Sequence, residues 1–96
     1  MCRHPGFSFI MPTYNRAFCI AGAVDSVLAQ NYDNLELIIV DDGSTDGTED
    51  FIRSRYAREL ACGRIKYLHG EHRGVCPARN IGLKQASKEW IAYIDS

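Results

Sequence analysis

The hydrophobic positions of this chain fall into short runs separated by amphipathic segments, and the clearest run covers residues 37–40, Leu-Ile-Ile-Val. An unbroken run rich in β-branched residues is typical of a strand buried on both faces of a parallel sheet. It ends at Asp41 and Asp42, and the polar, Gly-rich residues 43–48 follow as the turn into a helix. The pattern predicts two carboxylates at the carboxyl end of a strand, where open α/β sheets bind ligands.

Three more segments have the length and apolar content of strands: residues 7–11, 65–68 and 90–94. Helices are predicted between the strands, over residues 17–30, 46–60 and 77–86. The third of these helices is expected to lie close on the sheet through a narrow face of mostly small residues, which are Ala78, Ile81, Gly82 and Ala86.

The ends of the helices carry recognisable signals. Asn15 is a candidate cap for the first helix, and Asp46 with Glu49 has the spacing of a capping box at the start of the second. Gly63 suits the end of the second helix, and Pro77 suits the first turn of the third. These signals predict where each helix begins and ends.

Alternating strands and helices predict a parallel α/β unit with right-handed crossovers, a Rossmann-like half with helices on both faces of the sheet. The segment 65–68 is short and polar, which suits a sheet edge and favours the strand order 3-2-1-4. In that order the first and fourth strands meet at a switch point. Residues 13–16, Asp41, Asp42 and Asp95 would then gather at one end of the sheet.

Composition limits the class of protein. A chain of 96 residues with 46% hydrophobic and 24% charged residues is a single folded domain. The net charge of -1 provides no basic field, so nucleic acid is not an expected partner. The cysteines lack metal-ligand spacing and are interpreted as reduced thiols of a cytosolic protein; they are Cys2, Cys19, Cys62 and Cys76.

Nothing in the chain has the length of a membrane span. The apolar residues 7–11 are too short for the core of a signal peptide, and no window approaches the ~20 apolar residues of a spanning helix. The expected location is the cytoplasm, with membrane association of a longer protein left open.

Three ordered motifs, at residues 9–16, 40–48 and 78–83, together cover nearly the whole chain. With these motifs the chain resembles the N-terminal, nucleotide-sugar-binding part of a family 2, GT-A type glycosyltransferase, and residues 1–96 form one such unit. The resemblance implies transfer of a sugar from a UDP or dTDP sugar to an acceptor hydroxyl on a saccharide or a lipid-linked molecule. It also implies a divalent cation, Mn²⁺ or Mg²⁺.

The resemblance implies roles for individual residues. The loop after the first strand would frame the nucleoside, Asp41 would accept a hydrogen bond from the base, and Asp42 would mainly support the turn. Arg73 is a candidate for the base or the diphosphate. The implied nucleotide-binding residues are Pro12, Thr13, Tyr14, Asn15, Asp41, Arg73 and Asp95.

Asp95 matches the first acid of the family's Asp-x-Asp motif, which implies that it faces the ribose and the metal. The second acid of that motif, the acceptor site and the catalytic base of the family have no counterpart within residues 1–96. We therefore expect no catalytic residue in this chain and no turnover by the chain alone.

Several residues have structural alternatives. Asp41 and Asp42 could cap the following helix, and Arg79 is interpreted as a packing or salt-bridge residue. His69 and His72 could suggest a metal pair but fit solvated loop positions better. Cys76 at a helix start could be an activated thiol, although a packed or idle thiol is favoured.

Two other functional classes fit the sequence less well. A receiver domain also places an acid pair after a strand and binds Mg²⁺, but it needs a further acid where this chain has Leu68-His69-Gly70. A dinucleotide-binding domain needs a Gly-x-Gly-x-x-Gly turn after its first strand, and residues 12–15 contain no glycine. A third alternative, that the chain is a non-catalytic nucleotide-binding fragment, is left open by the sequence.

The fourth strand raises a separate expectation. Residues 90–94 contain neither charge nor proline, the usual devices that keep an edge strand from pairing. Because this strand lies at the edge of a 3-2-1-4 sheet, we expect the chain to self-associate through it, either across a two-fold axis or by exchange of the segment.

Overall fold

The computed structural model describes residues 6–30, 34–71 and 74–94. Strands and helices alternate in the predicted order: β1 (Phe7–Thr13), α1 (Ile20–Leu28), β2 (Leu35–Asp41), α2 (Thr48–Arg55), α3 (Ala57–Ala61), β3 (Ile65–His69), α4 (Val75–Gln85) and β4 (Trp90–Tyr93).

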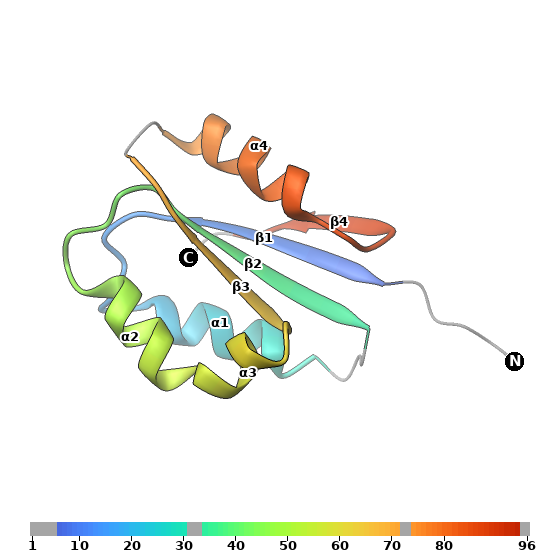
Figure 1. The fold of residues 1–96 in the computed structure, drawn as a ribbon, viewed down its shortest axis with the longest axis horizontal. Coiled ribbons are helices and arrows are strands. Elements are labelled where there is room, and N and C mark those ends of the chain that lie inside the picture. The colour runs from blue at the N-terminus through green and yellow to red at the C-terminus, as the bar shows by residue number, and fades with distance from the viewer. Residues whose placement is uncertain (1–5, 31–33, 72–73, 95–96) are drawn as a thin grey trace, which may run out of the picture.

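The strands form a four-stranded parallel sheet in the order β3-β2-β1-β4, which confirms the predicted topology. Figure 1 shows α1, α2 and α3 on one side of the sheet and α4 on the other. Thr13 of β1 pairs with Asp41 of β2, and Asp41 pairs with His69 of β3. The ends of these strands are therefore level, so the loops that follow them share one edge.

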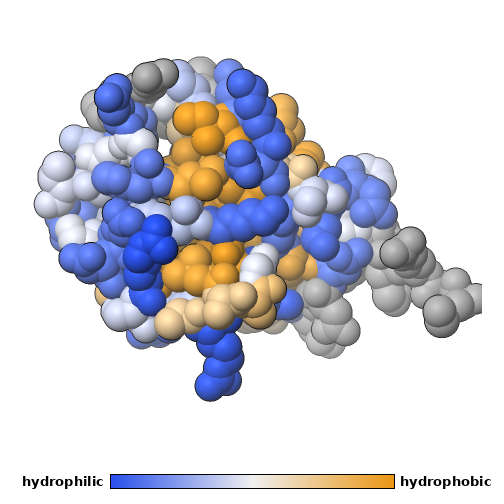
Figure 2. All heavy atoms as spheres, in the orientation of Figure 1, coloured by the Kyte–Doolittle hydropathy of each residue, from blue (hydrophilic) through white to orange (hydrophobic). Residues whose placement is uncertain are grey.

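β2 is buried along its whole length, as its apolar sequence predicts. Because side chains alternate across a strand, Leu37 and Ile39 join the core under α1, α2 and α3, whereas Ile38 and Val40 join the core under α4. In the view of Figure 2, apolar side chains gather in the middle of the molecule and hydrophilic ones lie around them.

α4 rests on the sheet through Ala78 and Gly82, and Ala86, just past the end of the helix, packs against the same core, so the predicted spacing of four residues is kept. Ile81 was expected on the same face, but its side chain is 42% exposed. The reason is geometric: a contact stripe at spacing i, i+4, i+8 leaves position 81 on the flank of the helix.

The predicted helix over residues 46–60 is divided at Tyr56 into α2 and α3. Tyr56 leaves the helical region, with φ −114° and ψ 32°. Its side chain is only 4% exposed, and its hydroxyl donates to Asp25 Oδ1 of α1 at 2.6 Å. A break at the residue anchored on α1 shows tertiary packing prevailing over local helix preference.

The two predicted N-terminal caps are only partly correct. Asn15 does not cap α1, which begins at Ile20 after Cys19 without a side-chain cap. The N-cap position of α2 is Gly47, which makes no side-chain cap bond; Asp46 precedes it, and its Oδ1 accepts from the Thr48 backbone N–H at 3.2 Å. Within the described residues Glu49 does not complete the capping box, because it pairs with Arg53 along α2 instead.

Candidate functional site

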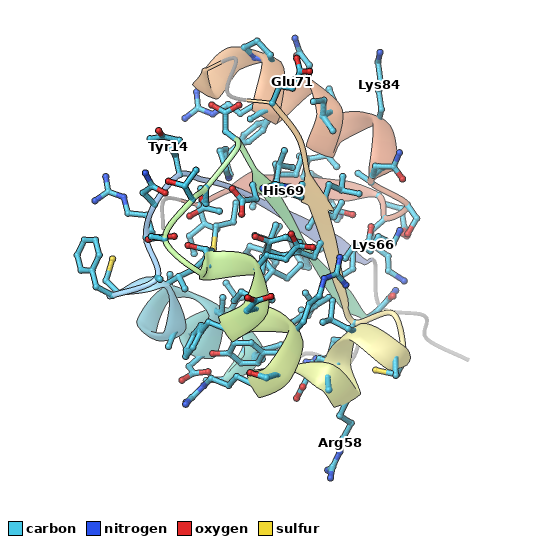
Figure 3. The ribbon with its side chains drawn as sticks, turned by 60° about the vertical axis from the view of Figure 1, so that its left-hand side comes forward. Tyr14, Arg58, Lys66, His69, Glu71 and Lys84 are labelled. Carbon is cyan, nitrogen blue, oxygen red and sulfur yellow. The ribbon has the colours of Figure 1, made fainter. Side chains whose placement is uncertain are left out.

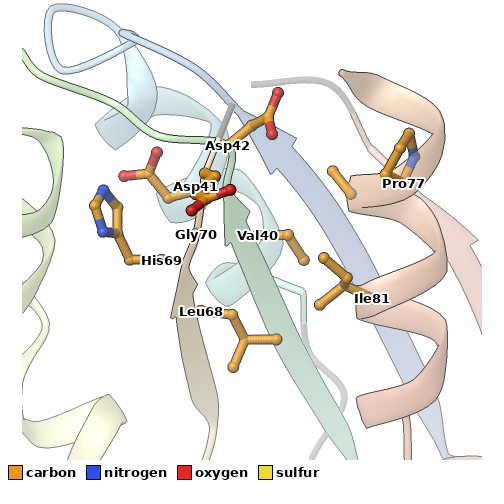
Figure 4. A pocket seen from close by; sticks show the side chains of 10 residues that line it. Val40, Asp41, Asp42, Leu68, His69, Gly70, Pro77 and Ile81 are labelled. Atoms are coloured by element: carbon orange, nitrogen blue, oxygen red, sulfur yellow. The ribbon is translucent and has the colours of Figure 1, made fainter. Parts of the chain in front are cut away.

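A cleft of about 290 Å³ lies at the carboxyl end of the sheet, between the ends of β2 and β3 and the helix α4. Figure 4 shows Val40 and Leu68 on the strands facing Pro77 and Ile81 on the helix. Polar groups gather at the strand ends, from Asp41, Asp42, His69, Gly70 and Glu71. Apolar walls with a few convergent polar groups are the usual character of a small-molecule site.

Asp41 is almost fully buried, at 1% exposure, and its carboxylate is held by two protein donors. Oδ1 accepts from the Ser44 backbone N–H at 2.7 Å, and Oδ2 accepts from the hydroxyl of Tyr67. These contacts support the turn after β2, and the hydrogen bond from a base to Asp41 that the resemblance implies stays a prediction. In this conformation the Asp41 carboxylate serves the 41–44 turn.

Asp42 faces the other side of the sheet, toward α4, and is 8% exposed. Its backbone N–H donates to the Thr13 carbonyl oxygen at 2.8 Å, and its Oδ2 accepts from the Gly74 N–H at 2.8 Å. Asp42 therefore links the ends of β1 and β2 to the start of α4, at the rim of the cleft.

Asn15 joins the loop after β1 to the loop after β2. Its backbone N–H donates to Ser44 Oγ at 2.8 Å, and its side-chain oxygen accepts from the Thr45 N–H at 2.8 Å. Asp46 adds a third bond through Oδ2, which accepts from the Ala17 N–H at 3.0 Å. Asn15 has a positive φ of 51°, a conformation that asparagine tolerates better than most residues. Sequence reasoning missed this link between the loops.

Pro12 and Thr13 are the last two residues of β1, Tyr14 follows them, and none of the three is part of the cleft lining. Thr13 is 4% exposed, and its Oγ1 has no hydrogen-bond partner among the described residues. Tyr14 is 42% exposed, and Figure 3 shows it at the same end of the molecule as Glu71. Pro12 is half-buried at the end of β1. The structure thus brings Pro12, Thr13, Tyr14, Asn15 and Asp41 to one edge, as predicted.

Three residues singled out from the sequence, Arg73, Asp95 and His72, lie outside the described residues. The backbone of Cys76 is part of α4, but its side chain also lies outside them.

Arg79 packs against β4, as the packing interpretation predicts. Its guanidinium carbon lies 5.4 Å from the centre of the Tyr93 ring, a cation–π contact between α4 and β4. Its Nε is buried without a hydrogen-bond partner within the described part of the chain.

His69 is the last residue of β3 rather than a loop residue, and its Nδ1 lies 3.7 Å from Glu49 Oε1. Its side chain is 40% exposed, in keeping with a solvated position. Residues 6–30, 34–71 and 74–94 contain no group of three or more His, Cys, Asp or Glu that could hold a metal ion. Because Asp41 and Asp42 already accept bonds from protein N–H groups, these residues alone do not fit a metal site.

Residues 8–96 match the profile of glycosyl transferase family 2, and the chain belongs to this family. Its four-stranded sheet, ordered β3-β2-β1-β4, has the fold of the GT-A type transferases. No helix among the described residues is long and apolar enough to cross a membrane.

Two relatives illustrate the match. The UDP-Glc:alpha-D-GlcNAc-diphosphoundecaprenol beta-1,3-glucosyltransferase WfgD of Escherichia coli is 42% identical over 90 residues, 93% of this chain and 34% of that protein. Glycosyltransferase GlyG of Streptococcus pneumoniae serotype 4 is 34% identical over 90 residues, 93% of this chain and 29% of that protein. The chain thus spans about a third of the length of these two relatives.

Two solved structures have the same fold. The mannosyltransferase PcManGT of Pyrobaculum calidifontis, in complex with GDP-Man and Mn²⁺, superposes with a TM-score of 0.86 and 33% identity, covering 97% of this chain and 28% of that one. TarS of S. aureus gives a TM-score of 0.79 and 33% identity, covering 94% of this chain and 16% of that one.

Proposed function

We propose that this chain is the donor-binding part of an enzyme that transfers a sugar from a nucleoside diphosphate sugar to an acceptor hydroxyl. The observation that carries the proposal is the cleft at the carboxyl end of the sheet in a family 2 chain. Its apolar walls suit the faces of a base, and carboxylate oxygens at the rim can accept from ring N–H groups.

The base would lie in the cleft at the ends of β2 and β3, and the rest of the nucleoside would reach toward the end of β1. Asp41 and Asp42 both line the cleft. Asp42 is the proposed acceptor for the base, because both carboxylate oxygens of Asp41 already accept from Ser44 and Tyr67, and Asp41 acts in the same site by holding the turn. Thr13 and Tyr14 would frame the nucleoside, with Pro12 and Asn15 shaping their loop. The buried Thr13 Oγ1, which lacks a partner within the described residues, supports a polar contact with a ligand there.

We propose a uracil or thymine donor, because both bases present one ring N–H to a carboxylate. The 42% identity to WfgD, whose name gives UDP-Glc as donor, supports UDP ahead of dTDP. PcManGT, at 33% identity, is in complex with GDP-Man, so guanine is the alternative.

A divalent cation, Mn²⁺ or Mg²⁺, is proposed as cofactor, with Asp95 as the ligand from this chain and Arg73 near the base or diphosphate. The Mn²⁺ in the PcManGT complex supports this. Such a cation stabilises the charge of a departing diphosphate. The described residues do not form its site.

The acceptor is proposed to be a saccharide or a lipid-linked sugar, in line with the diphosphoundecaprenol acceptor in the name of WfgD. An enzyme with such an acceptor would work at the cytoplasmic face of a membrane. The net charge of -1 gives no support for a nucleic-acid partner.

Calorimetry with UDP, dTDP, GDP and ADP, with and without Mn²⁺, tests the proposal on the whole protein that contains this chain. UDP or dTDP should bind most tightly, and the matching nucleotide sugar should release its diphosphate in the presence of acceptor. Binding without any release of diphosphate from a sugar-nucleotide panel would favour the non-catalytic alternative. No binding of any nucleotide would refute the proposal. The 96-residue chain alone should show no turnover.

A further inference from the structure

Tyr67 lies in the middle of β3, with its ring buried at 9% exposure under α2 and its hydroxyl on Asp41 Oδ2 of the neighbouring strand. The guanidinium of Arg53 lies 5.5 Å from the centre of the ring and covers it from α2. Burial, followed by the hydrogen bond to Asp41, raises the pKa of Tyr67 far above its ordinary value. The hydroxyl therefore remains a donor at every physiological pH.

The contact with Tyr67 is the inner end of a chain of hydrogen bonds. Asp41 accepts from both Tyr67 and the Ser44 N–H, and Ser44 Oγ accepts from the Asn15 N–H at 2.8 Å. The Asn15 side chain then accepts from the Thr45 N–H at 2.8 Å. These hydrogen bonds connect the core of the sheet to the loops that follow β1 and β2 at its carboxyl end.

We propose that Tyr67 is a positioning residue of the donor site, acting through Asp41 on the 41–45 turn and through that turn on the loop of residues 12–15. The inference rests on the proposed function, because these are the loops assigned to the nucleoside. Tyr67 itself touches neither the donor nor the reacting atoms. Its hydroxyl sets the orientation of groups that do.

Removing the hydroxyl has a specific physical consequence. In Tyr67→Phe the buried Asp41 carboxylate loses its hydroxyl donor and keeps the Ser44 N–H. A buried charged group that loses a donor is strongly penalised unless water or a new partner reaches it. The 41–44 turn is the part of this network nearest solvent, so we expect it to shift and to displace Asp42 and Asn15.

The chain provides a matched control in Tyr56. Like Tyr67 it is a buried tyrosine of the same core, at 4% exposure, and its hydroxyl donates to a carboxylate, Asp25 Oδ1, at 2.6 Å. Asp25 belongs to the helix α1 and not to either loop of the candidate site. Tyr56→Phe therefore removes the same chemical group from a buried ring, here on a carboxylate whose side chain is 48% exposed, without touching the donor network.

The experiment compares the two variants in the whole protein, by UDP calorimetry and by donor kinetics. Tyr67→Phe should raise the UDP dissociation constant and the donor KM by roughly tenfold, equivalent to about 1.4 kcal/mol. The value of kcat at saturating donor should change by no more than about twofold, because bound donor reorders the loops. Tyr56→Phe should lower the melting temperature and leave both affinities unchanged.

Equal affinity for UDP in wild type and Tyr67→Phe, with Asp42→Asn weakened, would overturn this inference while leaving the proposed function intact. A wild-type protein that binds no nucleotide would instead overturn the proposed function. A parallel loss of affinity in Tyr56→Phe would reduce Tyr67 to a purely structural residue and also overturn the inference.

Hydrogen exchange on the wild-type protein provides a test that holds even if Tyr67→Phe does not fold. The amides of Ser44 and Thr45, both donors in the network, should exchange slowly and still more slowly with UDP bound. Exchange at the rate of an exposed loop in both states would overturn the inference.

Discussion

Gly82 of α4 lies so close to Ile10 of β1 that a Cβ atom at position 82 would come within 2.5 Å of Ile10 Cγ2 and 3.2 Å of Val40 Cγ2. The glycine lets the helix backbone approach the sheet, and the same packing forms one wall of the cleft through Ala78. The small-residue face predicted from sequence therefore has a direct steric cause.

Gly82→Ala should destabilise the protein. Alanine favours a helix by about 1 kcal/mol over glycine, but overpacking of a buried contact costs about 1–3 kcal/mol. Gly22→Ala in α1 is the control, because a Cβ there meets nothing within 4 Å. Urea unfolding should show Gly22→Ala to be more stable than wild type by about 0.5–1 kcal/mol and Gly82→Ala less stable. A Gly82→Ala protein as stable as Gly22→Ala would contradict the close packing.

Glu36 connects β2 to the segment before β4. Burial by itself would raise its pKa, but the Ser8 hydroxyl, the Ser87 N–H and the Lys66 ammonium lower the pKa of Glu36 from 4.5 to about 2. A carboxylate with a lowered pKa in the folded state contributes stability that is present above about pH 4.5 and lost as the pH falls toward 2.

We therefore expect the free energy of unfolding to fall between pH 5 and pH 2 and to fall less steeply in Glu36→Gln. At neutral pH the substitution should cost about 2–3 kcal/mol, since it weakens several charge-assisted hydrogen bonds at a buried site. Asp50→Asn, an exposed change on α2, serves as the control. Parallel pH profiles for wild type and Glu36→Gln would show that another carboxylate governs acid unfolding.

Substitutions of the two adjacent acids, Asp41 and Asp42, should have different effects on UDP affinity and on stability. Asp42→Asn should weaken UDP binding by about 10- to 150-fold, the value of a hydrogen bond to a charged group, with little loss of stability. Asp41→Asn should lower both UDP affinity and melting temperature, because its carboxylate holds Ser44 and Tyr67. Calorimetry that finds wild-type affinity in Asp42→Asn would return the base-facing role to Asp41.

The sequence predicts the order of strands because each cue is local. The apolar residues 37–40 specify a central strand, and the polar residues 65–68 specify an edge. The break at Tyr56 was not predictable, since it depends on a hydrogen bond to Asp25 on another helix. Local signals specify the elements, and contacts between elements adjust their ends.

The roles of Asp41 and Asp42 show where sequence reasoning reached its limit. Alternation places Asp41 on the side of Ile39 and Asp42 on the side of Val40, but a strand buried on both faces does not reveal which helix covers which side. The bonds of Asp41 to Tyr67 and of Asn15 to Thr45 join residues 26 and 30 positions apart. They depend on strand register, which no short motif encodes.

β4 pairs with β1 on one side, and within the described residues no strand covers its other side. Trp90, Ile91 and Tyr93 are 57%, 37% and 50% exposed, and residues 90–93 carry no charge and no proline. An uncovered apolar edge strand is a template for pairing with a second chain. We propose that the occupant is the β4 edge of a second copy, related by a two-fold axis or by exchange of the segment.

Light scattering of the 96-residue chain at micromolar concentration tests this proposal. The expected mass is that of a dimer or a larger assembly, because pairing satisfies the open backbone groups of β4 and buries Trp90. Ile91→Lys should shift the chain toward monomer, since an inserted lysine is a natural means of blocking an edge. Leu83→Lys on α4, which also replaces an exposed apolar residue, is the control and should leave the mass unchanged. A wild-type monomer would refute edge pairing, and an equal effect of both lysines would point to general hydrophobic association instead.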